Sequence, residues 1–174
     1  MDDAMPVSAD QFKGAMRRWG SGVSILTTRR EGGIQGITVS AFCSVSLSPP
    51  LILVCIDKKA KSHPLIERHG GFAVNVLKVG QERLSEMAAG HAGEHGIWLE
   101  GIAYRKGTTG APILADCLAW FDCVLEAAHD GGDHTIFVGR VMETGHSDGR
   151  PLLYYDADYH RLAEPRARRP SSPS

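Results

Sequence analysis

Residues 36–62 read GITVSAFCSVSLSPPLILVCIDKKAKS, and this stretch decides the fold class. From residue 34 to residue 46, apolar and hydroxyl side chains alternate, which predicts a strand with one core face and one hydroxyl-lined face. The expected core face carries Ile37, Val39, Ala41, Cys43 and Val45. Residues 47–50 contain two prolines and predict a turn, and the apolar run at residues 51–56 predicts a second strand, buried on both faces.

The same stretch ends in a basic loop and the start of a helix. Residues 57–61 include three lysines, and Ser62 is a suitable N-cap for a short helix that contains Pro64 in its first turn and continues through Arg68. Backbone N–H groups at a helix start, with Lys61 and Ser62 beside them, suit a phosphate. The hydroxyl row suits a flat polar ring or a polyol chain. A solvent-facing strand followed by an ordinary lysine-rich loop would give the same pattern, so the residue types alone leave both interpretations open.

Short apolar segments and turns continue this pattern along the chain. We expect helices at residues 9–19, with Ser8 as N-cap, and 81–89, strands at residues 23–28, 72–77, 98–106, 116–129 and 134–144, and an aromatic segment at residues 153–162. Turns at residues 30–33 and 130–133 and a loop at residues 107–115 separate them. Many strands joined by hairpin turns, with few short helices, predict a mainly β, antiparallel barrel.

The composition indicates one domain and excludes several classes of protein. The chain has 174 residues, and we expect an N-terminal tail at residues 1–8, one domain at residues 9–162 and a disordered Arg/Pro/Ser tail at residues 163–174. The longest apolar run has six residues, whereas a membrane-spanning helix needs roughly 20. The acidic N-terminus lacks the apolar core of a secretory signal. Residues 1–164 carry 16 basic and 20 acidic side chains, a balance that disfavours nucleic-acid binding.

The cysteines and histidines predict neither a disulfide framework nor a metal site. The four cysteines stand at positions 43, 55, 117 and 123 and form no CxxC pair. Without a secretory signal, we expect reduced thiols and a cytoplasmic location. His91 and His95 have the spacing of metal ligands on one helix face, but Gly90 and Gly93 oppose a helix there, so we expect no metal.

Three blocks of sequence, in order, resemble the flavin reductase-like family, the small NAD(P)H:flavin oxidoreductases that serve two-component monooxygenases. The first block is residues 36–63, the second is GDHTIFVGRV at residues 132–141, and the third is PLLYYDADYHRL at residues 151–162. The likeness spans residues 9–162. The resemblance implies a split β-barrel, antiparallel and Greek-key-like, that binds FMN or FAD together with NADH or NADPH and forms homodimers.

The resemblance also implies which residues meet the flavin. The residues expected along the isoalloxazine and ribityl chain are Thr38, Val39, Ser40, Ala41, Ser44, Val45 and Ser46. The residues expected near the ribityl phosphate are Cys55, Ile56, Asp57, Lys61 and Ser62. Asn75 and Gln81 are expected to close the site.

His134 is the residue that the resemblance places on the nicotinamide side, as the expected catalytic residue. An imidazole there can pack on a ring and donate a hydrogen bond to a carboxamide. Tyr159 and Arg161 are further candidates near the pyridine nucleotide, and Arg161 or Arg105 is the expected partner of a 2′-phosphate if the nucleotide is NADPH.

The expected function is hydride transfer from the nicotinamide to the flavin, after which the reduced flavin leaves for a partner monooxygenase. Two alternatives stay open: a non-catalytic flavin-binding or electron-transfer protein, and an FMN-containing reductase of another substrate, such as a corrinoid or a chromate-like oxidant. The residues do not distinguish FMN from FAD, or NADH from NADPH. Most glycines are expected to mark helix ends and hairpins, and a minority, among the candidates Gly36, Gly132 and Gly139 in or beside the first two blocks, to give a cofactor close access to the backbone.

Overall fold

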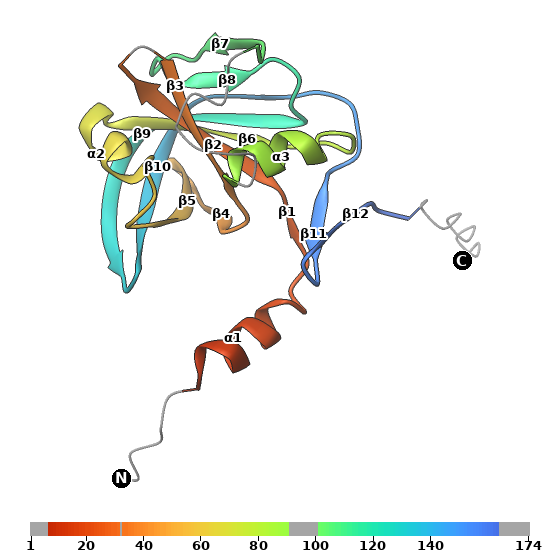
Figure 1. The fold of residues 1–174 in the computed structure, drawn as a ribbon. Helices are drawn as coiled ribbons and strands as arrows, with labels where there is room; N and C mark the ends of the chain where they lie inside the picture. Colours follow the sequence, from red (N-terminus) through yellow and green to blue (C-terminus); the bar gives the residue numbers. More distant parts are fainter. Residues whose placement is uncertain (1–6, 32, 91–100, 164–174) are drawn as a thin grey trace, which may run out of the picture.

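The computed structural model describes residues 7–31, 33–90 and 101–163 (Figure 1). Seven strands form the main sheet in the order β3-β2-β6-β9-β10-β5-β4. They are β2 (Ser24–Arg30), β3 (Gly33–Val39), β4 (Phe42–Leu47), β5 (Pro50–Asp57), β6 (Gly71–Val76), β9 (Ala119–Gly131) and β10 (His134–His146). Each neighbouring pair in this sheet is antiparallel, as the hairpin turns predict.

The main sheet curves round a core and forms a split barrel. The chain passes from the edge strand β3 to the opposite edge strand β4 through Ser40 and Ala41. There the backbone N–H of Cys55 donates a hydrogen bond of 3.1 Å to the carbonyl of Ala41, which ties the corner to β5. The sheet keeps two edges and is not closed. The enclosed core consists of Leu26, Val39, Ile52, Val54, Ile56, Ile66, Phe72, Val74, Cys123 and Phe137.

Two small sheets and three helices surround the barrel. Strands β1 (Ser21–Gly22), β11 (Leu153–Tyr155) and β12 (Asp158–His160) form one sheet, and β7 (Tyr104–Lys106) pairs with β8 (Pro112–Leu114) in the other. The helices are α1 (Ala9–Met16), α2 (His63–His69) and α3 (Glu82–Ala88). Figure 1 shows α1 extending away from the barrel, beyond the β1–β11–β12 sheet. No helix of the described residues is long and apolar enough to span a membrane.

The helix ends follow local chemistry. Ser8 caps α1 through a capping box with Gln11, as expected from its position. This helix ends at Met16, three residues earlier than predicted, and none of its residues is buried. Gly70 ends α2 in the left-handed region, with φ +62°, a conformation that suits glycine.

The predicted single strand at residues 34–46 is broken in two, and this corrects the expected core face. In β3 the side chains that face the barrel core stand at odd positions, as Val39 does. In β4 the side chain that packs on this core, Phe42, stands at an even position. Because the corner at Ser40 and Ala41 shifts the alternation by one residue, the expected core residues Ala41, Cys43 and Val45 are exposed instead. The next strand, β5, is likewise buried on one face only, because every second residue from Leu51 onward is half-buried rather than enclosed.

The segment at residues 107–115 was expected to be a loop, but it contains β8. All three residues of β8 are buried. The strand pairs with β7, and its Ile113 packs with Trp120. The strand expected at residues 116–129 is confirmed as β9, which begins at Ala119 and continues to Gly131. Residues 1–6 and 164–174 of the expected tails (1–8 and 163–174) and the His91–His95 pair lie outside the described residues. Of the strand expected at residues 98–106, residues 98–100 also lie outside them, and the described part forms a strand only at Tyr104–Lys106.

Gly139 packs against the core. A Cβ atom at this position would lie 2.6 Å from the Phe72 ring and 2.8 Å from Cβ of Cys123. Packing of the core therefore accounts for a glycine at this position. Gly132, by contrast, has φ +79° and belongs to the turn between β9 and β10.

Candidate functional site

The register of β4, β5 and β10 gathers the first two sequence blocks at one end of the barrel. Ala41 is hydrogen-bonded to Cys55, Cys55 is paired with Ile136, and two residues further along Asp57 is paired with His134. Three segments therefore lie next to one another: the hydroxyl-bearing corner, the C-terminal end of β5 and the Gly-Asp-His turn. Nearly 100 residues separate the first of these segments from the last.

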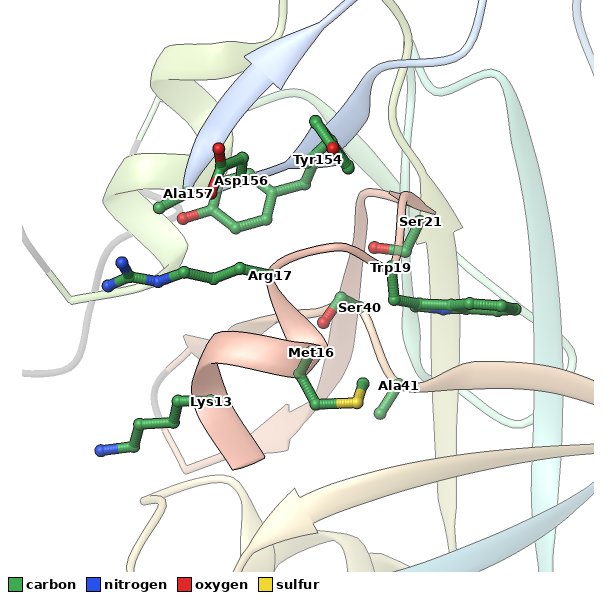
Figure 2. Close-up of a pocket in the computed structure, with 11 residues that line it drawn as sticks. Lys13, Met16, Arg17, Trp19, Ser21, Ser40, Ala41, Tyr154, Asp156 and Ala157 are labelled. Atoms are coloured by element: carbon green, nitrogen blue, oxygen red, sulfur yellow. The ribbon is translucent and has the colours of Figure 1, made fainter. Parts of the chain in front are cut away.

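A cavity of about 440 Å³ opens beside this corner, between α1 and the β11–β12 hairpin (Figure 2). Its lining residues are Lys13, Met16, Arg17, Trp19, Ser21, Ser40, Ala41, Tyr154, Tyr155, Asp156 and Ala157. We call it the arm cavity. Figure 2 shows Trp19 and Arg17 extending in opposite directions from the segment after α1, with Ser40 and Ala41 between the helix and the sheet. The walls therefore combine large apolar surfaces with two cations.

A second cavity of about 390 Å³ lies between α3 and the same hairpin, and we call it the α3 cavity. Its lining residues are Val23, Thr38, Ser40, Ser85, Glu86, Ala89, Tyr154, Ala157, Asp158 and Tyr159. The Thr38 hydroxyl donates a hydrogen bond of 2.6 Å to the carbonyl of Ser85, which fastens β3 to α3. Ser40, Tyr154 and Ala157 line both cavities, so the two adjoin at the hydroxyl-bearing corner.

The hairpin between the two cavities has an unusual backbone. Asp156 and Ala157 have φ values of +50° and +65°, which non-glycine residues rarely adopt. The Asp156 carboxylate accepts a bond of 3.1 Å from Arg18, and its backbone N–H donates to the carbonyl of Arg17. These contacts hold the turn against the segment that follows α1.

After the C-terminal end of β5, two of the three lysines of the basic loop, Lys58 and Lys61, have different surroundings. The amine of Lys58 donates to Asp130 and to the carbonyl of Gly132, so it fastens the β9–β10 turn. Lys61 is exposed. Ser62 precedes α2 but its side chain does not cap the helix; it is 1% exposed, and its hydroxyl has no hydrogen-bond partner among the described residues. A buried hydroxyl without a partner is a position where a ligand atom would be stabilised.

His134 stands at the start of β10 with its side chain 42% exposed. Its Nδ1 lies 2.7 Å from the Asp133 carboxylate, and this hydrogen bond lowers the pKa of Asp133. Nearby, His63 was not singled out from the sequence; its Nε2 lies 2.7 Å from the Thr135 hydroxyl and its ring packs on Phe137. Burial raises the pKa of the Cys55 thiol, which keeps it protonated near neutral pH.

Several side chains expected at the site form hydrogen bonds to the backbone or pack in the core instead. Asn75 is fully buried, and its amide bonds the backbone of Ile25 and Leu114, while the Gln81 amide bonds the backbone of Lys78 and Asp116. Neither fits the expected role of closing the site. The side chains of Val39 and Ile56 belong to the core, so only their backbone can meet a ligand.

The two arginines expected to receive a 2′-phosphate line neither cavity. Arg105 pairs with Glu143 at 2.5 Å and stacks over Trp120, away from both cavities. Arg161 lies 4.0 Å from Glu82 on α3. The aromatic and basic residues of the arm cavity, in contrast, were not predicted. Tyr154 lies in the third block, but its proximity to Trp19 and Arg17 depends on the packing of the two ends of the domain.

Comparison with known proteins agrees with this geometry. The family model of the flavin reductase like domain matches residues 16–163. The chain belongs to the flavin reductase like family. This flavin reductase-like chain is 37% identical over 153 residues to "FMN reductase (NADH) RutF 2" of Rhizobium rhizogenes, covering 87% of this chain and 88% of the relative. It is 39% identical over 158 residues to the Thermus thermophilus "4-hydroxyphenylacetate 3-monooxygenase, reductase component", covering 90% and 98%.

Solved structures of flavin reductases share the fold. "Flavin reductase PheA2 in native state" superimposes with a TM-score of 0.83 at 34% identity, covering 91% of this chain and all of that one. The NADH:FAD oxidoreductase SgcE6 of Streptomyces globisporus, solved with NAD and FAD fragments, gives a TM-score of 0.82 at 30% identity, covering 92% and 98%. The split barrel predicted from the three blocks is therefore the fold of this flavin reductase-like chain.

Proposed function

We propose that the chain is an NADH-dependent FMN reductase that supplies reduced flavin to a partner monooxygenase. The observation that carries the proposal is the corner at Thr38–Ala41, tied to Cys55 and opening into two adjoining cavities. Membership of the family and the names of the relatives support the reaction and the kind of partner.

The chain's own residues fit a flavin. Thr38 and Ser40 offer hydroxyls at the corner, and Ser62 offers a buried hydroxyl whose partner is missing among the described residues. We propose that the flavin lies along residues 38–41 and 44–46, with its phosphate toward residues 55–57, Lys61 and Ser62. Because Ser62 is enclosed while Lys61 is exposed, the hydroxyl would fix the position of the phosphate and the amine would supply charge.

The chemistry requires little more than orientation from the protein. A bound flavin accepts at N5 the hydride that NADH gives up from C4. The protein contributes by holding the two rings roughly 3–3.5 Å apart and by excluding water from between them. We propose that His134 contacts the nicotinamide, with its ring orientation fixed by the Nδ1 contact to Asp133. Tyr159, from the wall of the α3 cavity, would contact the rest of the nucleotide.

We propose further that two copies of the chain associate through α1. This helix buries none of its residues, and Phe12, Met16 and Trp19 are 58%, 49% and 71% exposed. Apolar side chains so presented are typical of an interface. The arm cavity lies along this helix, so a second copy seated on α1 would enclose it.

We also propose that the chain works in a reducing, cytoplasmic location, which its four free thiols support.

The deciding experiment is oxidation of NADH and of NADPH by the purified chain with FMN, FAD or riboflavin added. The proposal predicts NADH oxidation that depends on added FMN. A protein that is yellow as purified, retains its flavin and leaves NADH unoxidised would contradict the proposal and favour the alternative of a flavin carrier. Strong NADH oxidation only with a corrinoid or a chromate-like oxidant would favour the other alternative.

A further inference from the structure

The α3 cavity has the chemistry of a site for an uncharged, hydroxyl-rich group. Glu86 and Asp158 bring two carboxylates to it, and Ser85 brings a hydroxyl that the proposed flavin site does not use, beside the corner residues Thr38 and Ser40 that the two sites share. None of its described lining residues is a lysine or an arginine. Among these lining side chains a phosphate would meet two carboxylates and no cation, whereas hydroxyl groups would find acceptors.

Ser85 adds a second, independent observation. It lines this cavity, is 1% exposed, and its hydroxyl has no hydrogen-bond partner within the described parts of the chain. Its backbone carbonyl already accepts the hydrogen bond from the Thr38 hydroxyl, so the backbone there is fixed. The side-chain hydroxyl of Ser85 still lacks a hydrogen-bond partner among the described residues. Burying a hydroxyl without a partner is unfavourable, which points to a ligand group that pairs with it.

The neighbouring surfaces suit the remaining parts of a dinucleotide. Tyr154 and Tyr159 form an edge-to-face pair with ring centroids 5.5 Å apart, so the α3 cavity has an aromatic wall on which a base can pack. Across Ser40 lies the arm cavity, to which Lys13 and Arg17 bring positive charge suited to phosphates. The negative charge of Asp156 there is already paired with Arg18.

We propose that the α3 cavity binds the adenosine moiety of NADH, and that Glu86 and Asp158 select against the 2′-phosphate of NADPH. Their carboxylates accept hydrogen bonds from ribose hydroxyls and repel a phosphate in the same place. Arg161 does not line this cavity and lies 4.0 Å from Glu82 on α3. The assignment rests on the proposed function, because it takes NADH as the hydride donor.

Binding measurements on the full chain test this assignment independently of turnover. Dissociation constants of NAD⁺, NADP⁺, adenosine 2′-monophosphate, FMN and FAD are measured by calorimetry for the wild type, for the double variant Glu86→Gln with Asp158→Asn, and for Glu67→Gln. Glu67 is an exposed acid on α2, outside both cavities, and serves as the control for lost charge. We expect the wild type to prefer NAD⁺ over NADP⁺ at least tenfold, and the double variant to reduce that preference about tenfold with unchanged FMN binding.

Ser85→Ala separates a ligand role from a structural one. Because the hydroxyl has no partner among the described residues, removing it should leave the urea midpoint unchanged or raise it, yet weaken NAD⁺ binding severalfold. A lower urea midpoint with unchanged NAD⁺ affinity would overturn the role of Ser85.

The remaining outcomes separate this inference from the proposed function. An unaltered NAD⁺ to NADP⁺ ratio in the double variant, with FMN-dependent NADH oxidation intact, would overturn the inference alone. If the double variant alters only the dissociation constant of FAD, the cavity belongs to the adenosine of that flavin, and the assignment to NADH is overturned. Wild-type protein that binds NAD⁺ selectively but oxidises no NADH with FMN would support the cavity assignment and contradict the proposed function.

Discussion

The backbone N–H of Cys55 donates a 3.1 Å hydrogen bond to the carbonyl of Ala41. The bond connects β5, in which alternate residues are buried, with the exposed corner between β3 and β4. The corner therefore has a fixed position relative to the core. Because β10 pairs with the other side of β5, the same bond sets the distance from the corner to the turn that carries His134. The proposed flavin and nicotinamide residues are therefore held by sheet register rather than by flexible loops.

His134→Ala should weaken the use of NADH more than the binding of flavin, because the imidazole is assigned to the nicotinamide. We expect the KM for NADH to rise roughly tenfold, a loss of about 1.4 kcal/mol, with little change in the Kd of FMN. His129→Ala, an exposed histidine on β9, is the control. Steady-state kinetics at several fixed FMN concentrations give both constants. An unchanged dependence on NADH together with lost FMN affinity would reject the assignment.

Lys61→Ala should weaken FMN more than riboflavin, since only FMN carries the phosphate assigned to Lys61 and Ser62. We expect a loss of about 1 kcal/mol for FMN, roughly fivefold in Kd, and none for riboflavin. Flavin fluorescence titrations measure both, and Lys106→Ala on β7 controls for overall charge. Equal losses for the two flavins would remove the phosphate from this position.

Gly139→Ala should destabilise the barrel, because the new Cβ would meet Phe72 at 2.6 Å and Cys123 at 2.8 Å. Overpacking of this kind costs about 1–3 kcal/mol. Gly33→Ala is the matched control, because a Cβ there meets no atom of the described chain within 4 Å. Urea unfolding followed by tryptophan fluorescence compares the two, and equal midpoints would contradict the packing role of Gly139.

Replacing Phe12 and Met16 together by lysine should reduce association of the chain, because both side chains are exposed on α1. Light scattering after size exclusion should give a mass near twice 18.8 kDa for the wild type and near the single-chain mass for the variant. Met142→Lys, an exposed methionine on β10, is the control and should leave the dimer intact. A wild type of single-chain mass at micromolar concentration would contradict the proposed dimer.

Thiol reagents should modify Cys43 first, because it is exposed. Burial raises the pKa of Cys117 from 9.0 to about 11 and that of Cys123 to about 12, so neither is a thiolate at pH 8. Ellman's reagent should therefore titrate one fast thiol, which Cys43→Ser removes, and all four after unfolding. The two buried thiols ionise more readily in the unfolded chain, so the free energy of unfolding should fall as the pH rises above 9. Rapid modification of Cys117 or Cys123 in folded protein at pH 8 would contradict this.

Some features of the site depend only on neighbours in space. Asn75 lies in a strand next to apolar residues, and its sequence surroundings do not reveal that its amide bonds β2 and the end of β8. Gly139 lies in a block that resembles a cofactor motif, but Phe72, 67 positions earlier, explains the glycine. The residues of the arm cavity come from the first and last parts of the domain, and no local pattern relates them.

The sequence by itself determined most strands of the main sheet, the hairpin turns and the Ser8 cap of α1, because alternation, turn residues and capping groups act over a few neighbouring positions. Its three blocks also determined the family. Only the tertiary structure decided that the chain turns at Ser40 and Ala41 and that Cys43 and Val45 face outward. It also decided that the hydroxyls of Ser62 and Ser85 find no hydrogen-bond partner among the residues that the structure describes. Burial and pairing depend on segments far apart in the chain, so the periodicity that predicts a strand cannot show what each of its faces meets.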